Sequence, residues 1–208
     1  MSVVGGTSTT GLVTRVQNMI MKPAAEWDVV ATEPATVAGL YTGYAMILAA
    51  IPAIATLIGA ILLSHLNPIA AVVTAALGYV LALVGLFITA FIVDALAPSF
   101  GGEKNQVQAL KLVVYANTAA WVAGVLNIIP LLGALAGLVG GIYSLYTLYL
   151  GLPKLMKNPA DKTLVYFIVT LVVAVVVYAV IGIVVGIIIG MLALGAVATG
   201  AAATGAIR

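Results

Sequence analysis

The chain has 208 residues, of which 64% are apolar and 7% are charged, and its net charge is +2. Eight Lys and Arg with six Asp and Glu cannot supply the solvated surface that a soluble fold of this size needs. No basic patch indicates a nucleic-acid partner. The absence of cysteine excludes disulfides, thiolate catalysis and Cys-ligated metals. We therefore expect an integral membrane protein in contact with the lipid bilayer, without a cofactor.

The N-terminal segment, residues 1–36, is expected to be cytoplasmic and to contain one short amphipathic helix. Thr10 is expected to cap this helix and Pro23 to end it. Its apolar residues share one face: Leu12, Val16, Met19 and Ile20. Two interpretations are equally open. The helix lies in the plane of the membrane surface with Trp27 at the interface, or it is a packed or frayed N-terminal helix.

Two membrane spans are expected next, at residues 37–63 and 68–93. The sixty residues 34–93 carry no charge, which is far more than the ~20 that cross a hydrocarbon core. Pro52 is expected to kink the first span, and Pro68 suits the first turn of the second. The short polar turn between them makes the two spans an antiparallel hairpin.

Residues 94–106 are expected to form the first loop in water. Gly101 and Gly102 act as helix breakers there, and Lys104 is expected to be solvated. Asp94, at the end of the second span, has two interpretations: a proton-binding site or, more commonly, a solvated carboxylate at a helix end.

Three further spans complete an all-α bundle of five transmembrane helices, at residues 107–128, 131–152 and 163–194. The uncharged run at 112–153 is too long for one helix, and the Asn-Ile-Ile-Pro turn at 127–130 divides it. A polar loop at 154–162 precedes the last span. The tail at 195–208 is rich in Ala and Gly, so that both helix continuation and disorder remain open.

The positions of the cations predict the orientation. Seven of the eight Lys and Arg would share one side of this bundle: Arg15, Lys22, Lys104, Lys111, Lys154, Lys157 and Lys162. The opposite side would hold His65, the turn at 127–130 and Arg208. Under the positive-inside rule, the N-terminus is expected in the cytoplasm and the C-terminus outside.

Glycines recur at every fourth residue on the last two spans: Gly133, Gly137 and Gly141, and then Gly182, Gly186 and Gly190. Helices in lipid associate through van der Waals contacts and Cα–H···O bonds, which small residues permit. We expect these two glycine faces to pack within the chain. Association with a second copy or with another membrane protein is the other interpretation.

The polar residues expected at membrane depth are Asn117, Thr118 and Asn127 on the third span, and Tyr143, Ser144, Tyr146, Thr147 and Tyr149 on the fourth. An amide in hydrocarbon needs a partner, so Asn117 is expected to form a hydrogen bond between helices, with Tyr143 as one candidate. The other interpretation is that Asn117 lines a solute path. We expect no catalytic or metal site, because the single histidine, His65, has no carboxylate near it in the sequence.

Several stretches resemble a known family. They are residues 108–118 (QALKLVVYANT), Trp121, residues 127–130 (NIIP), 142–146 (IYSLY) and 149–153 (YLGLP), together with residues 23–27 (PAAEW). In these the chain resembles a bacterial member of the Yip family, the Ypt-interacting proteins. The resemblance extends from about residue 11 to the fifth span and implies five transmembrane helices.

Eukaryotic relatives have a longer cytoplasmic N-terminal region, and they associate with Rab-type GTPases and with one another in vesicle traffic. This chain has a short N-terminal region and lacks their Asp-Leu-Tyr-Gly-Pro motif. The fold is therefore expected to carry over, whereas the departure argues against GTPase binding. The resemblance supplies no catalytic residues.

We hypothesise a non-enzymatic, Yip-like protein of the bacterial cytoplasmic membrane that organises membrane proteins or lipids through helix association. The alternative is a small-solute or lipid transporter or channel with a polar cavity near Asn117. A coupled carrier would more often show paired buried charges or interrupted helices at matching positions. A water-filled polar cavity reaching the middle of the membrane would separate the two hypotheses.

Overall fold

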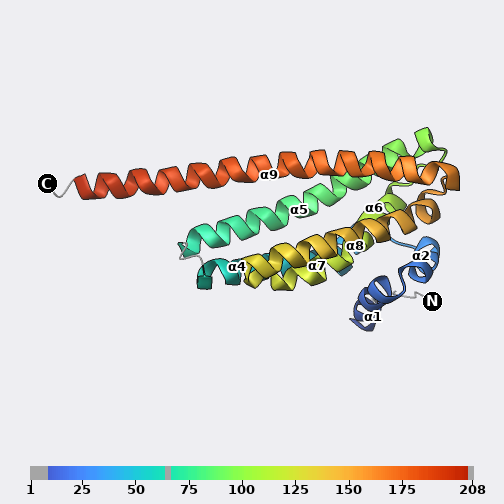
Figure 1. The fold of residues 1–208 in the computed structure, drawn as a ribbon, viewed down its shortest axis with the longest axis horizontal. Helices are drawn as coiled ribbons and strands as arrows, with labels where there is room; N and C mark the ends of the chain where they lie inside the picture. The colour runs from blue at the N-terminus through green and yellow to red at the C-terminus, as the bar shows by residue number, and fades with distance from the viewer. Residues whose placement is uncertain (1–8, 64–66, 206–208) are drawn as a thin grey trace, which may run out of the picture.

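The computed structural model describes residues 9–63 and 67–205. It confirms the expected all-α membrane fold: these two ranges contain no strand, and five of their helices are long and apolar enough to cross a membrane. Most of the helices run along the long axis of the molecule, and α9 lies against α5 (Figure 1). The predictions for His65 and Arg208 concern residues outside the described ranges.

The helical elements follow one another in chain order. The N-terminal part contains α1 (Thr9–Met21) and α2 (Pro23–Thr32). The first span consists of α3 (Val37–Leu40), the π-helical segment η1 (Tyr41–Ala45) and α4 (Met46–Leu63), and the second of α5 (Pro68–Leu96) and the 3-10 segment η2 (Ala97–Phe100). The third consists of α6 (Gln106–Ala116), α7 (Thr118–Ala123) and the 3-10 segment η3 (Gly124–Ile128). The fourth span is α8 (Pro130–Met156), and the chain ends with α9 (Ala160–Gly205).

The start of α5 shows why the first hairpin turns where it does. Pro68 occupies the first turn of the helix, where its missing amide leaves no hydrogen bond unmade. The Asn67 side chain accepts a hydrogen bond from the Ile69 amide at 2.9 Å, and so caps the helix. This short connection places α5 antiparallel to α4, and the two helices pack against each other.

Several helices extend further than the sequence predicts. The second span continues through η2, so Asp94 lies inside a helix and the predicted loop from residue 94 shrinks to residues 101–105. Helix formation continues past this carboxylate because Val93 and Ala97, on either side of it, are both fully buried. Helix α8 runs beyond Pro153, and α9 continues to Gly205, so the described part of the small-residue tail is helical.

The third span is interrupted at Asn117. Helix α6 ends one residue before it and α7 begins one residue after it. The Asn117 side chain donates a hydrogen bond to the Val113 carbonyl at 2.8 Å, one turn earlier. Asparagine side chains that bond to nearby backbone groups compete with regular helix hydrogen bonds, which explains the break at this residue.

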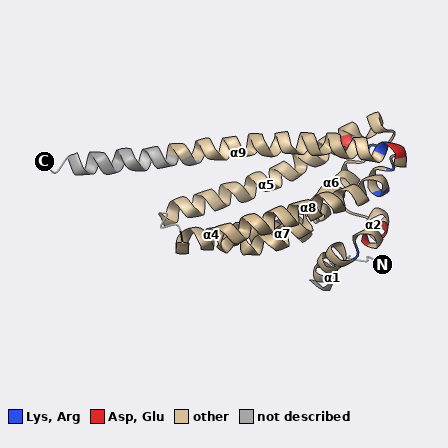
Figure 2. Cartoon of the chain, viewed as in Figure 1, with Lys and Arg blue, Asp and Glu red and all other residues tan. Residues whose placement is uncertain are grey.

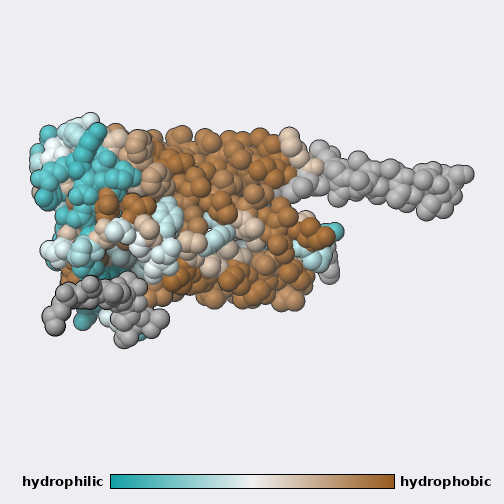
Figure 3. Space-filling view, turned by 180° about the vertical axis from the view of Figure 1, so that it is seen from behind, coloured by the Kyte–Doolittle hydropathy of each residue, from teal (hydrophilic) through white to brown (hydrophobic). Residues whose placement is uncertain are grey.

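The charges of the described part gather at one end of the bundle. Figure 2 shows its Lys, Arg, Asp and Glu residues around α1, α2 and the helix ends near α6, α8 and α9. Seen from behind, the same end is hydrophilic, and a broad apolar band covers the neighbouring length of the bundle (Figure 3). We call this part of the molecule the charged end.

The two predicted glycine faces do not pack within the chain as expected. A Cβ atom added to Gly133 would lie 2.7 Å from Asn127 Oδ1, so this glycine is in close contact. A Cβ would meet no described atom within 4 Å at the other five positions: Gly137, Gly141, Gly182, Gly186 and Gly190. The internal-packing interpretation is therefore wrong for these five, whereas their contact with another molecule stays a prediction.

Other glycines make the close contacts between helices. A Cβ on Gly59 would lie 2.4 Å from the Ile128 carbonyl oxygen, and one on Gly140 would lie 3.0 Å from Ala120 Cα. A Cβ on Gly124 would lie 2.6 Å from Cβ of Pro52, the proline inside α4. The first, third and fourth spans therefore approach each other at glycines outside the four-residue repeats.

Candidate interaction site at the charged end

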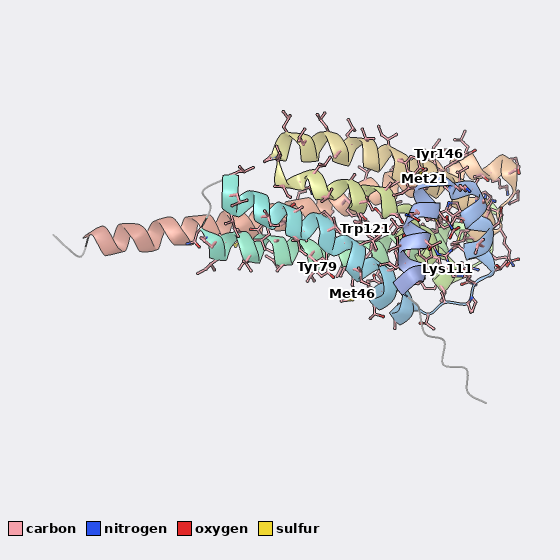
Figure 4. The ribbon with its side chains drawn as sticks, turned by 90° about the horizontal axis from the view of Figure 1, so that it is seen from below. Met21, Met46, Tyr79, Lys111, Trp121 and Tyr146 are labelled. Carbon is pink, nitrogen blue, oxygen red and sulfur yellow. The ribbon has the colours of Figure 1, made fainter. Side chains whose placement is uncertain are left out.

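Helices α1 and α2 form a cap on the charged end. Figures 1 and 4 show both helices crossing the long axis of the spanning helices. Pro23 starts α2 directly after α1, as a proline in a first turn can. The predicted cap residue Thr10 instead lies inside α1, which begins one residue earlier. Met19 is 1% exposed, so the apolar face of α1 packs against the bundle.

Trp27 of α2 anchors the cap in the fourth span. Its side chain is fully buried, and its indole Nε1 donates a hydrogen bond to the Thr147 carbonyl at 2.9 Å. A Cβ atom on Gly151 would lie 2.6 Å from Trp27 Cε2 and 2.7 Å from Leu112 Cδ1. The glycine therefore leaves the space that the indole occupies. The expectation that Trp27 lies at the membrane interface is wrong, because its ring is fully buried between Gly151 of α8 and Tyr115 of α6.

Arg15 joins the two helices of the cap. Its guanidinium donates to Glu26 Oε1 at 2.5 Å and to the Glu33 carboxylate, while Asn18 donates to Glu26 Oε2 at 2.9 Å. The Arg15 Cζ atom lies 5.5 Å from the centre of the Tyr115 ring of α6. Burial lowers the pKa of Arg15, but the hydrogen bond and charge of Glu33, with the charge of Glu26, raise that pKa above its ordinary value. The guanidinium is therefore a permanent positive centre inside the cap.

Lys111 holds the other end of α2. The sequence counts it among the cations on the cytoplasmic side and inside the third span, and the structure places it in α6 with 3% of its surface exposed. Its Nζ donates to the Val30 carbonyl at 2.9 Å and to the Glu33 carbonyl. The last carbonyls of a helix lack partners within the helix and attract cations. Gln108 adds a hydrogen bond from Nε2 to the Ala31 carbonyl at 3.0 Å.

Two residues of α8 complete the contacts of the cap. Lys154 Nζ donates to the Ala24 carbonyl at 2.9 Å and to Asp28 Oδ1 at 2.5 Å. The Tyr143 hydroxyl donates to the Ile20 carbonyl at 2.5 Å, at the end of α1. Tyr143 therefore bonds to the cap, and the predicted pairing of Tyr143 with Asn117 is wrong.

The outer surface of α1 remains open. Met21 is 77% exposed, and in Figure 4 it is labelled near Tyr146 of α8, which is 51% exposed. The ring of Tyr146 lies 5.7 Å from that of Tyr143, which itself contacts the end of α1. The packing interpretation of α1 therefore holds for its inner face, whereas contact of its exposed outer face with the membrane surface stays a prediction.

At membrane depth Thr118, and not Asn117, forms a side-chain hydrogen bond between helices. Thr118 is 1% exposed, its Oγ1 lies 2.8 Å from the Tyr44 hydroxyl, and it donates to the Tyr115 carbonyl at 2.6 Å. The prediction of an interhelical partner for Asn117 is wrong, because the amide bonds within its own span. Asn127 reaches the first span through a long contact of 3.4 Å from Nδ2 to Thr56 Oγ1.

The loop after η2 is shaped by its two glycines. Gly101 has a φ of 75°, a left-handed conformation that glycine adopts without strain. A Cβ on Gly102 would lie 2.6 Å from the Met156 carbonyl oxygen, so the loop passes close to the end of α8. Lys104 is exposed, as expected. Asp94 differs from a solvated carboxylate, because its Oδ1 atom is buried and no described group donates to it.

Sequence patterns missed the residues that seat the cap. Gly151 was not among the candidates and Trp27 was expected at the membrane interface, although both lie in stretches that carry the family resemblance. In the structure Trp27 packs directly against Gly151, so two of the stretches that carry the resemblance meet at this contact. Among residues 9–63 and 67–205, no cluster of three or more His, Asp or Glu could hold a metal ion.

Comparison with protein families matches residues 18–181 to the Yip1 domain. The matched part begins within α1, contains Trp27, Lys111, Asn117 and Gly151, and ends within α9. No curated protein and no solved structure matches the chain. Because the match covers most of the sequence and the helices are long and apolar enough to span a bilayer, this membrane protein belongs to the Yip1 domain family.

Proposed function

We propose that this protein is a non-enzymatic organiser or adaptor of the bacterial cytoplasmic membrane, which associates with other membrane proteins, with a second copy or with lipids. Membership of the Yip1 domain family supports a membrane-associated adaptor role. The observation that carries the proposal is the hydrogen bonding of polar side chains at membrane depth. Asn117, Thr118 and Thr147 each bond to groups of this same chain, Thr118 and Thr147 across to another helix.

Transport would require polar groups that face a water-filled path. Thr118 is buried and bonded to Tyr44, and the Asn117 amide is bonded to Val113. Thr147 is 2% exposed, and its Oγ1 lies 2.9 Å from the Ser144 carbonyl that accepts its hydrogen bond. None of these hydrogen bonds requires a water-filled path, and this arrangement favours an organiser over a carrier.

The orientation forms part of the proposal: the charged end lies in the cytoplasm and the C-terminus outside. The gathering of the described charges at one end supports this orientation under the positive-inside rule. Because the chain has no cysteine, single cysteines report the side of the membrane directly. In intact cells, a membrane-impermeant maleimide is expected to label Asn67→Cys, and to label Ser99→Cys only after permeabilisation. The reverse pattern would overturn the orientation.

Flux measurements in proteoliposomes test the function itself. We expect no movement of Na⁺, K⁺ or protons above that of empty vesicles, either for the wild type or for Asn117→Leu. The substitution removes one hydrogen bond within a span, and membrane hydrogen bonds contribute only about 0.6 kcal/mol on average, so the variant should stay folded.

Thr118→Val is the matched control for the flux experiment, because it removes the bond to Tyr44 while Asn117 remains. Its melting temperature in detergent is expected to fall more than that of Asn117→Leu. Reproducible wild-type flux that disappears in folded Asn117→Leu but persists in Thr118→Val would contradict the organiser and favour a transporter.

A further inference from the structure

The end of α1 is held beside the membrane-spanning part of α8. The hydrogen bond from the Tyr143 hydroxyl to the Ile20 carbonyl joins the two helices. Tyr143 is the central residue of α8, thirteen residues from Pro130 and thirteen from Met156. Because α8 crosses a hydrocarbon core of about 30 Å with roughly 40 Å of helix, its centre lies within that core. The end of α1 is therefore surrounded by lipid wherever protein does not cover it.

The outer face of α1 is apolar at both of its ends. Val13 is 57% exposed and Met21 is 77% exposed, whereas Met19 on the inner face is 1% exposed. Val13 and Met21 are eight residues apart, a spacing that places both on one side of a helix. Gln17 lies between them and is also exposed. A face of this mixed character suits the boundary between headgroups and acyl chains rather than the centre of the hydrocarbon.

The outer face of α1 adjoins the lipid-facing surface of α8. Figure 4 labels Met21 near Tyr146, which is 51% exposed on this span. The ring of Tyr146 lies 5.7 Å from that of Tyr143, the residue that bonds to the end of α1. The bilayer that covers the exposed part of α8 therefore also covers Met21.

Lys22 adds a positive charge to this surface. Its side chain is exposed, and no described carboxylate forms an ion pair with it. The three carboxylates of α2 and of the residue after it are already paired, two with Arg15 and one with Lys154. A lysine beside lipid lays its methylene groups along apolar surface and places its ammonium among the headgroups. A phosphate that carries negative charge is the complementary group there.

We propose that α1 is seated in the leaflet at the charged end, with Val13 and Met21 against acyl chains and Lys22 bound to the phosphate of an anionic phospholipid. Interfacial helices bind a membrane through buried apolar area and through the attraction of their cations to anionic lipids, and α1 supplies both on its outer face. The inference deepens the proposed organiser function, on which it rests for its biological meaning, by naming an anionic phospholipid as one partner.

Labelled single cysteines test the position of α1, because the chain has no cysteine of its own. The full-length protein is reconstituted in vesicles of phosphatidylcholine and phosphatidylglycerol with the fluorophore nitrobenzoxadiazole on Met21→Cys. Its emission should be quenched by spin-labelled phospholipids and not by iodide present on both sides. Val139→Cys, at a residue 68% exposed on α8, is the lipid-facing control, and Ser99→Cys is the exposed control at the charged end. Quenching of Met21→Cys by iodide, as for Ser99→Cys, would overturn the proposal.

Native mass spectrometry tests the phosphate contact. From an equimolar mixture of phosphatidylglycerol and phosphatidylcholine, the wild type should retain an excess of phosphatidylglycerol. Lys22→Gln should lower this excess about fivefold, the contribution of one lysine near an anionic membrane surface, and Lys22→Arg should keep it. Lys104→Gln is the matched control. Lys104 is also exposed, but the bond from the Glu103 amide to the Met156 carbonyl holds its loop at the end of α8.

An excess of phosphatidylglycerol that is absent in the wild type, or unchanged in folded Lys22→Gln, would overturn the proposal. A loss in Lys22→Arg or in Lys104→Gln as large as that in Lys22→Gln would also overturn it. Melting temperatures show that each variant is folded. The flux experiment is separate: transport would contradict the organiser even if α1 were seated in lipid, and an α1 exposed to water would leave the organiser standing.

Discussion

Gly151→Ala is expected to lower the melting temperature of the purified protein, whereas Gly141→Ala on the same helix should leave it unchanged or raise it. A Cβ at Gly151 would lie 2.6 Å from the Trp27 ring and 2.7 Å from Leu112, but at Gly141 it would meet nothing within 4 Å. Overpacking of a tight site costs about 1–3 kcal/mol, while alanine is better than glycine by up to about 1 kcal/mol in a helix. Of the two substitutions, only Gly151→Ala should therefore lower the stability.

A compensating change distinguishes the proposed cause from general damage to α8. Replacing the indole with the smaller ring of phenylalanine, as Trp27→Phe, makes room for the new methyl group and should recover part of the stability lost in Gly151→Ala. Recovery would be incomplete because the hydrogen bond from Trp27 to the Thr147 carbonyl is lost. Equal melting temperatures for Gly151→Ala and Gly141→Ala would show that Trp27 is not seated against this glycine.

Arg15→Met is expected to destabilise the cap by about 3 kcal/mol, because it leaves the Glu26 carboxylate without its cation. The two side chains are 16% and 8% exposed, so water cannot fully replace the lost partner. Adding Glu26→Gln removes the unpaired charge and should restore much of the loss, so that the double variant is more stable than Arg15→Met alone. Thermal melting in detergent measures all three proteins, and near-ultraviolet absorption of the tyrosines reports whether the Tyr115 environment opens.

The exposed pair of Lys157 with Glu103 is the control for this experiment. Its side chains are 64% and 66% exposed, and the distance between Nζ and Oε2 is 2.8 Å. Exposed ion pairs contribute about 0–1 kcal/mol, so Lys157→Met should change the melting temperature little. A loss in Arg15→Met no larger than that in Lys157→Met would contradict a structural role for the Arg15 cluster.

Together these contacts make the cap a fixed part of the bundle. Trp27 fills a slot in α8, and Lys111 binds the last carbonyls of α2. A partner in water at the charged end would therefore meet the outer surface of α2, and not the inner surfaces of α6 and α8. We expect variants that loosen the cap to lose thermal stability before they lose membrane insertion, since the apolar spans are unchanged.

The sequence by itself determined the fold class and the division into charged and apolar parts. A bilayer requires long uncharged segments with internally paired backbone, so composition and spacing alone predict an all-α membrane protein. Local chemistry also predicted that α5 begins at Pro68, because a proline in the first turn depends on its immediate neighbours. By contrast, the sequence predicted that the second span ends near Asp94, and the helix in fact continues past it. The residues beside Asp94 are buried, and a local sequence pattern does not show burial.

Only the tertiary structure decided which residues meet. A four-residue repeat places Gly137 and Gly141 on one face of a helix, but it does not say what lies opposite, and here it is Gly151 that receives Trp27. A polar residue in a span needs a partner, but the sequence does not choose between a bond within the helix, as at Asn117, and one between helices, as at Thr118. The burial of Lys111 could not be read from the sequence either, because the carbonyls that bind it come from α2, about eighty residues earlier in the chain. Periodicity reports the faces of single helices, whereas contacts depend on how several helices cross.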